Sequence, residues 1–183
     1  MRYCMLKQEN TGLIVIDIQG KLAHLVHDSN ALLSNCEKLI KGIKVLGLPI
    51  IWLEQNPAKL GPTVSELSSL LETIPLIPKF TFDAFKEPLF MDAINAANVE
   101  TWLICGIEAH ICVYQTALHL QQSGLKVQLV CDCISSRTLD NKHLAINKLV
   151  NRGIDISGLE MCLYELVKDC RATEFKEILS LIK

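Results

Sequence analysis

Three side chains suited to hydrolysis stand near the ends of apolar runs in this sequence. Cys112 lies in the first turn of a helical pattern (110–124) that follows the apolar run "TWLICG" (101–106). A helix N-terminus carries roughly half a positive charge, which can lower the pKa of a cysteine there until the thiol becomes a nucleophilic thiolate near neutral pH. The alternative role for Cys112 is an inert thiol packed in the core, a common place for free cysteine.

Asp17 and Lys79 are the charged residues that could act on such a thiol. Asp17 closes the first apolar run, and Lys79 follows a proline-containing run in mid-chain. In an open parallel sheet, ligands bind at the carboxyl ends of the strands where the strand order reverses. With the order 3-2-1-4-5-6, the first and fourth strands are neighbours, so Asp17 and Cys112 are predicted to face one crevice. Lys79 follows an edge strand and must reach across to them.

The elements that must position these residues alternate along the chain. Short apolar runs predict strands at 12–18, 49–54, 101–106 and 126–132, with shorter or edge strands at 74–80 and 153–157. Pro75 and Pro78 cannot donate to a ladder, so 74–80 is predicted to lie at an edge. Apolar residues at intervals of three and four predict crossover helices at 29–47, 87–99, 110–124 and 141–153, and the tail predicts two more helices separated near 170–173.

This alternation predicts one α/β domain over residues 1–183. The fold class is a three-layer α/β/α, Rossmann-like architecture, in which a six-stranded, mainly parallel sheet of order 3-2-1-4-5-6 carries helices on both faces. The segment "NPAKLGPT" (56–63) is the one loop rich in proline and glycine that is long enough to act as a lid or an interface element.

The composition argues against several classes of partner. The formal net charge is −2 and no run of lysine or arginine occurs, so neither nucleic acid nor a membrane surface is expected as a partner. The start, "MRYCMLKQEN", lacks the apolar core of a signal peptide, which predicts a cytoplasmic protein with free thiols. Of the eight cysteines, six are predicted to be simply buried: Cys4, Cys36, Cys131, Cys133, Cys162 and Cys170.

Three motifs together resemble one family. "IVIDIQ" at the end of the first strand, "PKFTFDAF" in mid-chain and "ICGIEAHICVYQTALHL" before a helix are similar to the cysteine hydrolases of the isochorismatase-like superfamily. Within it, "LEQNPAKLGPTV" and "DCISSR" resemble the isochorismatase domain-containing proteins. The resemblance spans roughly 11–183 and implies a catalytic triad of Asp17, Lys79 and Cys112.

The resemblance also implies a mechanism. In that family the bond corresponding to Ile107–Glu108 is a cis peptide that turns two backbone amides toward the substrate. Asp17 would take the thiol proton, and Cys112 would attack the carbonyl of a small amide to form a thioester. The backbone N–H groups of Glu108 and Cys112 would meet the oxyanion. Asp17→Asn is accordingly predicted to raise the pKa of the thiol.

Residue Glu108 departs from the small residue that many amidase relatives carry at this position. Its carboxylate would either narrow the pocket and repel anions or point outward to solvent. By position alone, five residues are predicted to contact substrate: Gln19, Glu54, Gln55, Phe85 and Tyr114. The nicotinamidase branch binds a metal through Asp-x-His after the second strand, where this chain has Glu54, Gln55 and Asn56, so no metal and no cofactor are predicted.

Two further readings of the sequence remain open. An isochorismatase proper would cleave a vinyl ether with Asp17 as the acid, but it would favour cationic pocket residues, and none beyond Lys79 is evident. A catalytically idle scaffold or redox-responsive interaction protein would keep the triad without turnover. Apolar stripes in "LEMCLYELV" and "FKEILSLIK" predict a homo-oligomer, a dimer or a larger even-numbered assembly.

Overall fold

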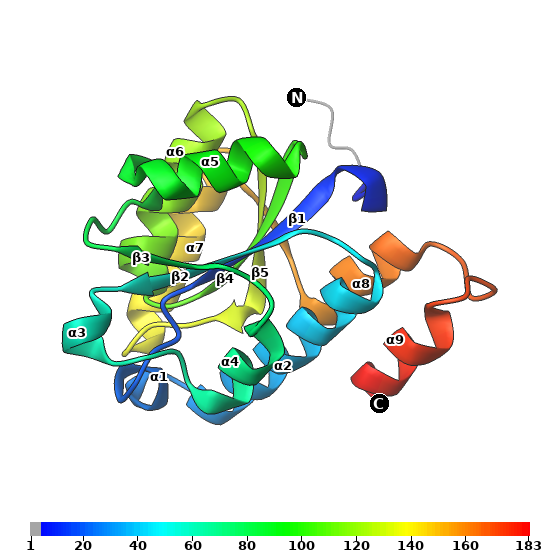
Figure 1. The fold of residues 1–183 in the computed structure, drawn as a ribbon, viewed down its shortest axis with the longest axis horizontal. Helices are drawn as coiled ribbons and strands as arrows, with labels where there is room; N and C mark the ends of the chain where they lie inside the picture. The colour runs from blue at the N-terminus through cyan, green and yellow to red at the C-terminus, as the bar shows by residue number, and fades with distance from the viewer. Residues whose placement is uncertain (1–4) are drawn as a thin grey trace.

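A single six-stranded sheet organises the chain in the computed structural model, which describes residues 5–183. The strands run in the order β3-β2-β1-β4-β5-β6, and every neighbouring pair is parallel (Figure 1). Their bounds are β1 Thr11–Ile16, β2 Ile50–Gln55, β3 Leu76–Lys79, β4 Thr101–Gly106, β5 Lys126–Ile134 and β6 Asp155–Ser157. The predicted strand order is confirmed, and the two strands predicted to be short lie at the two edges.

Helices cover both faces of this sheet. On one face lie α2 (Ser29–Val45), α4 (Ser65–Leu71), α8 (Leu159–Val167) and α9 (Phe175–Ile182); on the other lie α5 (Pro88–Ala97), α6 (Tyr114–Gln122) and α7 (Leu139–Val150) (Figure 1). The short helices α1 (Leu22–Leu25), α3 (Pro57–Leu60) and α4 were not predicted. They lie in the connections after β1 and β2, where no long periodic pattern marks them.

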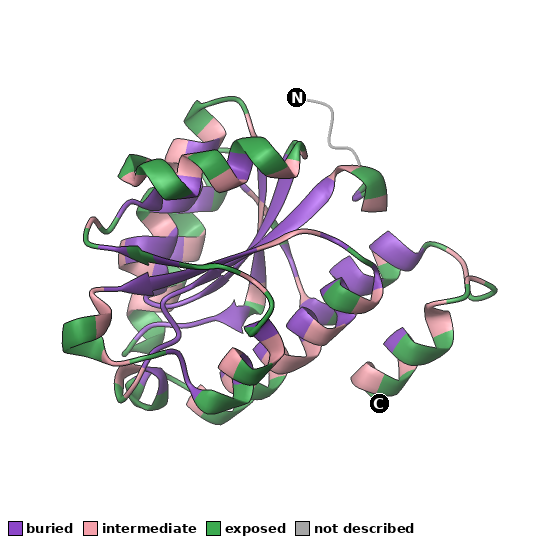
Figure 2. Cartoon of the chain, viewed as in Figure 1, coloured by how far each residue is buried: buried purple, intermediate pink, exposed green. Residues whose placement is uncertain are grey.

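The strands are apolar along their whole length because both faces of the sheet are covered. In β1, Leu13 and Val15 pack with α2, whereas Ile14 and Ile16 pack with the core on the opposite face. Figure 2 shows the resulting buried centre and the exposed outer sides of the helices. The alternation along one strand therefore fixes which face each side chain enters.

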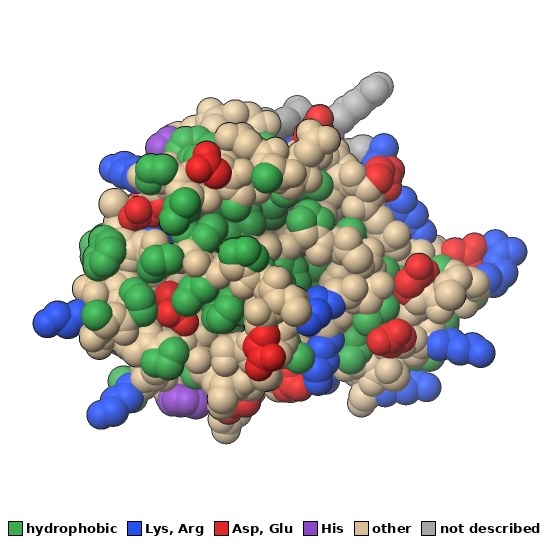
Figure 3. Space-filling model, in the orientation of Figure 1, with side chains coloured by type: hydrophobic (Ala, Val, Ile, Leu, Met, Phe, Trp, Pro, Cys, Tyr) green, Lys and Arg blue, Asp and Glu red, His purple; other side chains and the backbone are tan. Residues whose placement is uncertain are grey.

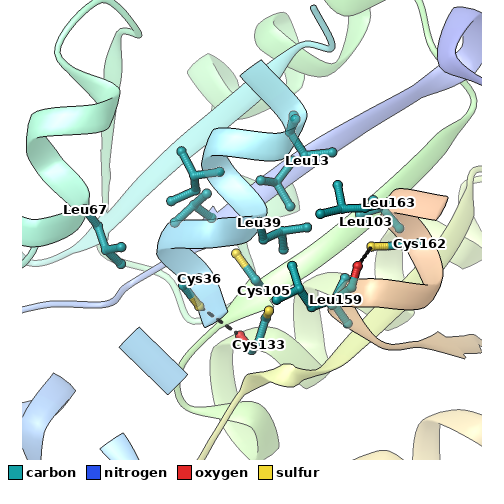
Figure 4. Close-up of a cluster of buried hydrophobic side chains, with 14 of the residues drawn as sticks. Leu13, Cys36, Leu39, Leu67, Leu103, Cys105, Cys133, Leu159, Cys162 and Leu163 are labelled. Carbon is teal, nitrogen blue, oxygen red and sulfur yellow. Dashed lines mark hydrogen bonds between the residues drawn. The ribbon is translucent and has the colours of Figure 1, made fainter. Parts of the chain in front are cut away.

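Four of the seven cysteines that the structure describes lie on the α2 face, in a different core cluster from Cys112. Cys36, Cys105, Cys133 and Cys162 are fully buried there among leucines (Figure 4). The prediction of burial is confirmed for three of the six cysteines named above, but Cys131 is half-buried and Cys170 is exposed. Cys4 lies outside the described residues. The seven cysteines among residues 5–183 are all free thiols.

The two strands that flank the reversal of strand order approach each other closely at Gly106. A Cβ on this residue would lie 2.1 Å from the Ile16 carbonyl oxygen, and its φ of +128° favours glycine. The next residue, Ile107, donates its N–H to the same Ile16 oxygen over 2.9 Å. Gly106 therefore lets the chain after β4 pass directly beside the end of β1.

The C-terminal helices use their apolar stripes within the chain. Leu159, Leu163 and Leu166 of α8 are buried, and Ile178 of α9 is buried in the same cluster as residues of α2. Helix α2 therefore covers part of both stripes, and the packing of one stripe against another subunit stays a prediction. None of the helices formed by residues 5–183 is long and apolar enough to cross a membrane.

Candidate active site

Asp17, Lys79 and Cys112 meet in one buried cluster at the carboxyl edge of the sheet. The Nζ atom of Lys79 lies 2.7 Å from Oδ2 of Asp17. The Cys112 thiol lies close enough to the Asp17 carboxylate and the Lys79 amine for both groups to shift its pKa. The exposed fractions are 3% for Asp17, 0% for Lys79 and 6% for Cys112. The structure therefore brings the three predicted residues together, in an environment nearly free of solvent.

The backbone turn at the end of β1 aims Asp17 into this cluster. Asp17 has a φ of +55°, a left-handed conformation in which aspartate is among the better-tolerated non-glycine residues. Its N–H still donates to the Leu53 oxygen over 3.2 Å, and its own oxygen accepts from Gln19 N over 2.9 Å. The chain thus leaves the sheet within one residue, and the carboxylate stays at the strand end.

Lys79 reaches the site from β3, with β2 lying between β3 and β1. Gln55 pairs with Lys79 in the β2–β3 register, and its side-chain Oε1 accepts from Nζ over 2.6 Å. The Thr81 carbonyl oxygen also accepts from Nζ over 3.3 Å. Gln55 was predicted to contact substrate, but its amide oxygen is engaged with Lys79 and its Nε2 donates to the Phe80 oxygen over 2.8 Å.

Cys112 lies in a π-helical turn, η3 (Ala109–Val113), which leads directly into α6. Burial is the main cause that raises the pKa of its thiol to about 12. The Asp17 carboxylate raises this pKa further, whereas Lys79 lowers it. The prediction of a lowered pKa was wrong for this resting state, because desolvation and a neighbouring anion outweigh the helix start and the lysine. The proton therefore rests on sulfur at neutral pH.

The Asp17 carboxyl is also held in its protonated form more strongly than an exposed aspartate. Burial raises the pKa of this group, while the charge of Lys79 and hydrogen bonds from Lys79 and Cys112 oppose the rise. Moving a proton from the thiol to the carboxyl costs free energy in proportion to the difference between their pKa values. Because burial raises the pKa of Asp17, this difference is smaller than it would be for an exposed aspartate. The pairing suits transfer of the thiol proton to Asp17 during a reaction.

The turn between β4 and η3 contains a cis peptide at Ile107–Glu108, as the resemblance implied. No residue from 5 to 183 accepts a hydrogen bond from the Glu108 N–H, which leaves this donor available to a ligand. The Glu108 side chain is buried, and its Oε1 lies 2.5 Å from Nε of Arg137. Its Oε2 lies 3.4 Å from Nδ1 of His110. The outward, solvated orientation of Glu108 is therefore wrong.

Two more of the predicted pocket residues, Gln19 and Glu54, are buried and hydrogen-bonded within the protein. Gln19 donates to the Gly61 oxygen over 2.7 Å and accepts from Gln55 N over 2.6 Å. Glu54 accepts from the N–H and hydroxyl of Thr63 over 2.6 and 2.8 Å. Both fix the segment 56–63, which contains α3 and is tied to the strand ends at Gly61 and Thr63. These contacts occupy polar atoms of Gln19 and Glu54, and a substrate role for the two residues stays a prediction.

The two aromatic candidates lie on the α6 side of the site. Phe85 is half-buried and stacks on His119, with ring centroids 3.9 Å apart. Tyr114 begins α6, and the Lys148 Nζ lies 5.0 Å from its ring centroid. Neither contact places an aromatic ring against Cys112. Within residues 5–183, no three histidine, cysteine or acidic side chains converge as metal ligands.

Sequence reasoning missed three residues near the site. Arg137, in the segment "DCISSR", brings a second cation to the turn that carries Glu108, and the pair neutralises the carboxylate expected to repel anions. Asp83 and His119 form a pair between the loop after Lys79 and helix α6. Asp83 could have been found because it lies in the motif "PKFTFDAF". No sequence pattern marks His119, because its partner is 36 residues away.

The fold and the site define a doubly wound α/β protein with a cysteine, an aspartate and a lysine clustered at the reversal of strand order. Residues 11–161 match the model of the isochorismatase domain. The chain belongs to the isochorismatase family and has the fold of its hydrolases. The expectation drawn from the three sequence motifs is therefore confirmed at the level of family and fold.

Curated relatives support the same assignment over most of the chain. The secreted isochorismatase effector Isc1 of Phytophthora sojae is 32% identical over 93% of this chain and 83% of its own length. Isochorismatase domain-containing protein 2 of Danio rerio is 30% identical over 97% of this chain and 89% of its own length.

Solved structures show the same architecture. The MAR1 ribonuclease of Caenorhabditis elegans superposes with a TM-score of 0.92 at 32% identity, covering 98% of this chain and 92% of its own. YcaC of Escherichia coli, described as an octameric hydrolase of unknown specificity, superposes with a TM-score of 0.93 at 23% identity, covering 99% and 92%. At 23% identity, the similarity to YcaC supports the fold alone.

Proposed function

We propose that this chain is a cysteine-dependent hydrolase that cleaves a small amide or a related C–N bond. The observation that supports this most is the buried contact among the Cys112 thiol, the Asp17 carboxylate and the Lys79 amine. A thiol alone would be inert at the raised pKa given above. A thiol beside an acceptor for its proton and a cation for its negative charge can act as a nucleophile.

The proposed first half-reaction is acyl transfer to sulfur. Asp17 takes the proton from Cys112 as the sulfur attacks the substrate carbonyl carbon, and Lys79 stabilises the negative charge in the cluster. The backbone N–H groups of Glu108 and Cys112 stabilise the oxyanion, each worth roughly 2.7–4 kcal/mol by analogy with a donor in other acyl-transfer enzymes. The C–N bond then breaks, the departing amine takes the proton from Asp17, and a thioester remains on Cys112.

The second half-reaction releases the acyl group. A water molecule gives a proton to Asp17 and attacks the thioester carbonyl, with the oxyanion again held by the same two N–H groups. The C–S bond breaks, the carboxylic acid leaves, and the proton on Asp17 returns to the sulfur. Asp17 thus acts as base and acid in turn, which agrees with its raised pKa and its contact with the thiol.

A vinyl ether hydrolase is a second candidate because one observation favours it. Burial raises the pKa of Asp17, and a protonated aspartate could donate to the carbon of a vinyl ether. Arg137 supplies a cation beyond Lys79, but its guanidinium is engaged with Glu108. The amide proposal uses the Cys112 thiol and this one does not, so a Cys112 variant separates the two. An idle scaffold would react by neither route.

A panel of small amides should leave one acyl group on Cys112. We expect intact-mass spectrometry of the protein, quenched in acid during turnover, to show a mass increase equal to the acyl portion of a productive amide, because thioesters survive acid. Peptide mapping should place it on Cys112 and not on exposed Cys170. Hydrolysis of an amide without any adduct on Cys112, under conditions that trap the thioester of a control cysteine hydrolase, would contradict this route.

Partner and location remain predictions of the proposed function. The ribonuclease named above raises RNA as a possible substrate, whereas the net charge of −2 provides no basic surface for a phosphate backbone. An RNA arm in the same panel is expected to show no cleavage. A cytoplasmic location is still proposed, although the relative from Phytophthora sojae is named as secreted.

We expect a dimer or a larger even-numbered assembly, now for a different structural reason. Hydrophobic side chains gather on the face shown in Figure 3, around β3 and α5. Three exposed hydrophobic side chains belong to the segment that follows β3 and to the start of α5: Phe80 is 70% exposed, Phe82 54% and Leu89 60%. Light scattering at micromolar concentration should give an even multiple of 20.4 kDa. Phe80→Ser should lower that mass, whereas Leu144→Ser on α7, also well exposed, should not. A monomeric wild type would refute the proposal.

A further inference from the structure

The loop between β3 and α5 follows one residue of the candidate site and packs on the helix that follows another. It begins directly after Lys79 and contains a short 3-10 turn, η2 (Ala84–Lys86). Helix α6, on which the loop lies, follows directly from the π-helical turn that carries Cys112. The loop is therefore continuous with Lys79 at one end and contacts the helix that follows Cys112.

The outer end of the loop is fastened to α6 by two polar contacts and one aromatic contact. Nδ1 of His119 donates to Oδ2 of Asp83 over 2.8 Å, and the two side chains are 38% and 10% exposed. The His119 ring stacks on Phe85. The Ala84 N–H donates to the hydroxyl of buried Thr116 over 3.0 Å. The His119 pair is the only one of these contacts in which charge can add to the hydrogen bond.

The inner end of the loop holds the lysine. Thr81 accepts from the Lys79 Nζ through its backbone oxygen, and its hydroxyl lies 2.8 Å from both the Asp83 backbone oxygen and Oε1 of Glu87. The Thr81 N–H donates to Oε1 of Glu87 over 3.1 Å, which closes the loop on itself. A displacement of Asp83 would therefore be transmitted through Thr81 to an oxygen that orients the amine.

We propose that the Asp83–His119 pair is a positioning contact that sets where the Lys79 amine lies relative to the Cys112 thiol. Neither residue of the pair touches the reacting atoms, so its effect on chemistry passes through Lys79. The inference rests on the proposed function, because it matters only if the amine supports the thiolate. It assigns to His119 a role that charge and exposure alone would not suggest.

The rate of alkylation of Cys112 by iodoacetamide tests this role in the intact protein. Lys79 lowers the pKa of Cys112, so an amine released from its position should leave less thiolate. His119→Leu is expected to slow alkylation of Cys112 about tenfold at pH 9, the change in thiolate for one unit of pKa. His119→Asn, whose amide nitrogen takes the place of Nδ1, should restore most of the rate. His143→Leu, an exposed histidine on α7, is the matched control.

Other cysteines report on the fold within the same sample. Exposed Cys170 provides the reference rate, and the four fully buried thiols at 36, 105, 133 and 162 should remain unmodified. Slower Cys112 alkylation with an unchanged Cys170 rate and protected buried thiols would support the proposal. An unchanged rate at Cys112 would overturn it. If the buried thiols of His119→Leu become reactive, Asp83→Ser replaces it, because serine can still cap Phe85 N but is too short to reach His119.

Two failures can be told apart in this design. If the wild type forms acyl adducts on Cys112 and Asp83→Ser and His119→Leu both react as the wild type does, the positioning role is wrong and the proposed function stands. If the wild type forms no adduct with any amide while His119→Leu still slows alkylation about tenfold, the positioning role stands and the amide hydrolase is wrong. A double variant no slower than either single one would show that both act through one contact.

Discussion

Replacing Cys112 with alanine is expected to abolish amide turnover while leaving the fold intact. Removing the nucleophile of an acyl-transfer enzyme lowers kcat on the order of a millionfold. Alanine is the best helix former, and the deleted atom is a single sulfur, so the turn that carries it should persist. Steady-state hydrolysis should fall below detection, and the melting temperature should stay within a few degrees of the wild type.

A matched variant and a second substrate make this result decisive. Cys170→Ala removes an exposed thiol far along the chain and should leave hydrolysis unchanged. Retained amide hydrolysis in Cys112→Ala would show that the thiol is not the nucleophile. Retained vinyl ether cleavage in the same variant, with amide hydrolysis lost or never present, would favour the route in which Asp17 is the acid.

Asp17→Asn is expected to lower the pKa of the Cys112 thiol and, at the same time, to lower turnover. The Asp17 carboxylate raises the pKa of Cys112 and Lys79 lowers it, so an uncharged amide at position 17 leaves only the favourable charge. The thiol should ionise at lower pH than in the wild type. Turnover should nevertheless fall by about 10²–10⁴-fold, since no group remains to carry the proton to the leaving amine.

The pH profile of Cys112 alkylation measures the first effect and amide hydrolysis measures the second. The midpoint of the alkylation profile should move to lower pH in Asp17→Asn, the reverse of the shift predicted from sequence. Asp169→Asn, at an exposed pair with Arg171, is the control and should move neither quantity. A midpoint that stays in place or rises would show that Asp17 does not act on the thiol through its charge.

The fold could be predicted because its signals are local. Each strand is a short apolar run, each crossover helix repeats every three or four residues, and Pro75 and Pro78 mark an edge strand. The short helices α1, α3 and α4 were not predicted, because four to seven residues are too few to show a helical repeat of apolar side chains. The C-terminal stripes were recognised, but the element that covers them, α2, could not be, because that contact joins residues more than a hundred positions apart.

The sequence predicted that Asp17, Lys79 and Cys112 lie together, but it did not predict how their burial changes the acidity of the thiol. The three residues could be identified from the family motifs and from the predicted strand order. The acidity of the thiol depends on how much solvent the packed cluster excludes and on the balance of two neighbouring charges, and neither is a property of sequence spacing. Likewise, Gln19 and Glu54 lie where substrate residues were expected, yet their polar atoms are used by the backbone around Gly61 and Thr63.

Strand order limits which amino acid can occupy position 79. Neighbouring strands are about 4.8 Å apart, so β3, separated from β1 by β2, starts roughly 10 Å from the aspartate it must meet. Histidine on β3 would end beside Gln55, and only the long side chains of lysine or arginine span the intervening strand. Selection at position 79 therefore acts on the length of the side chain as well as on its charge. If the strand that carries this residue lay directly beside β1, lysine would no longer be required, and a sheet with that strand order could build the same cluster with a shorter cationic side chain.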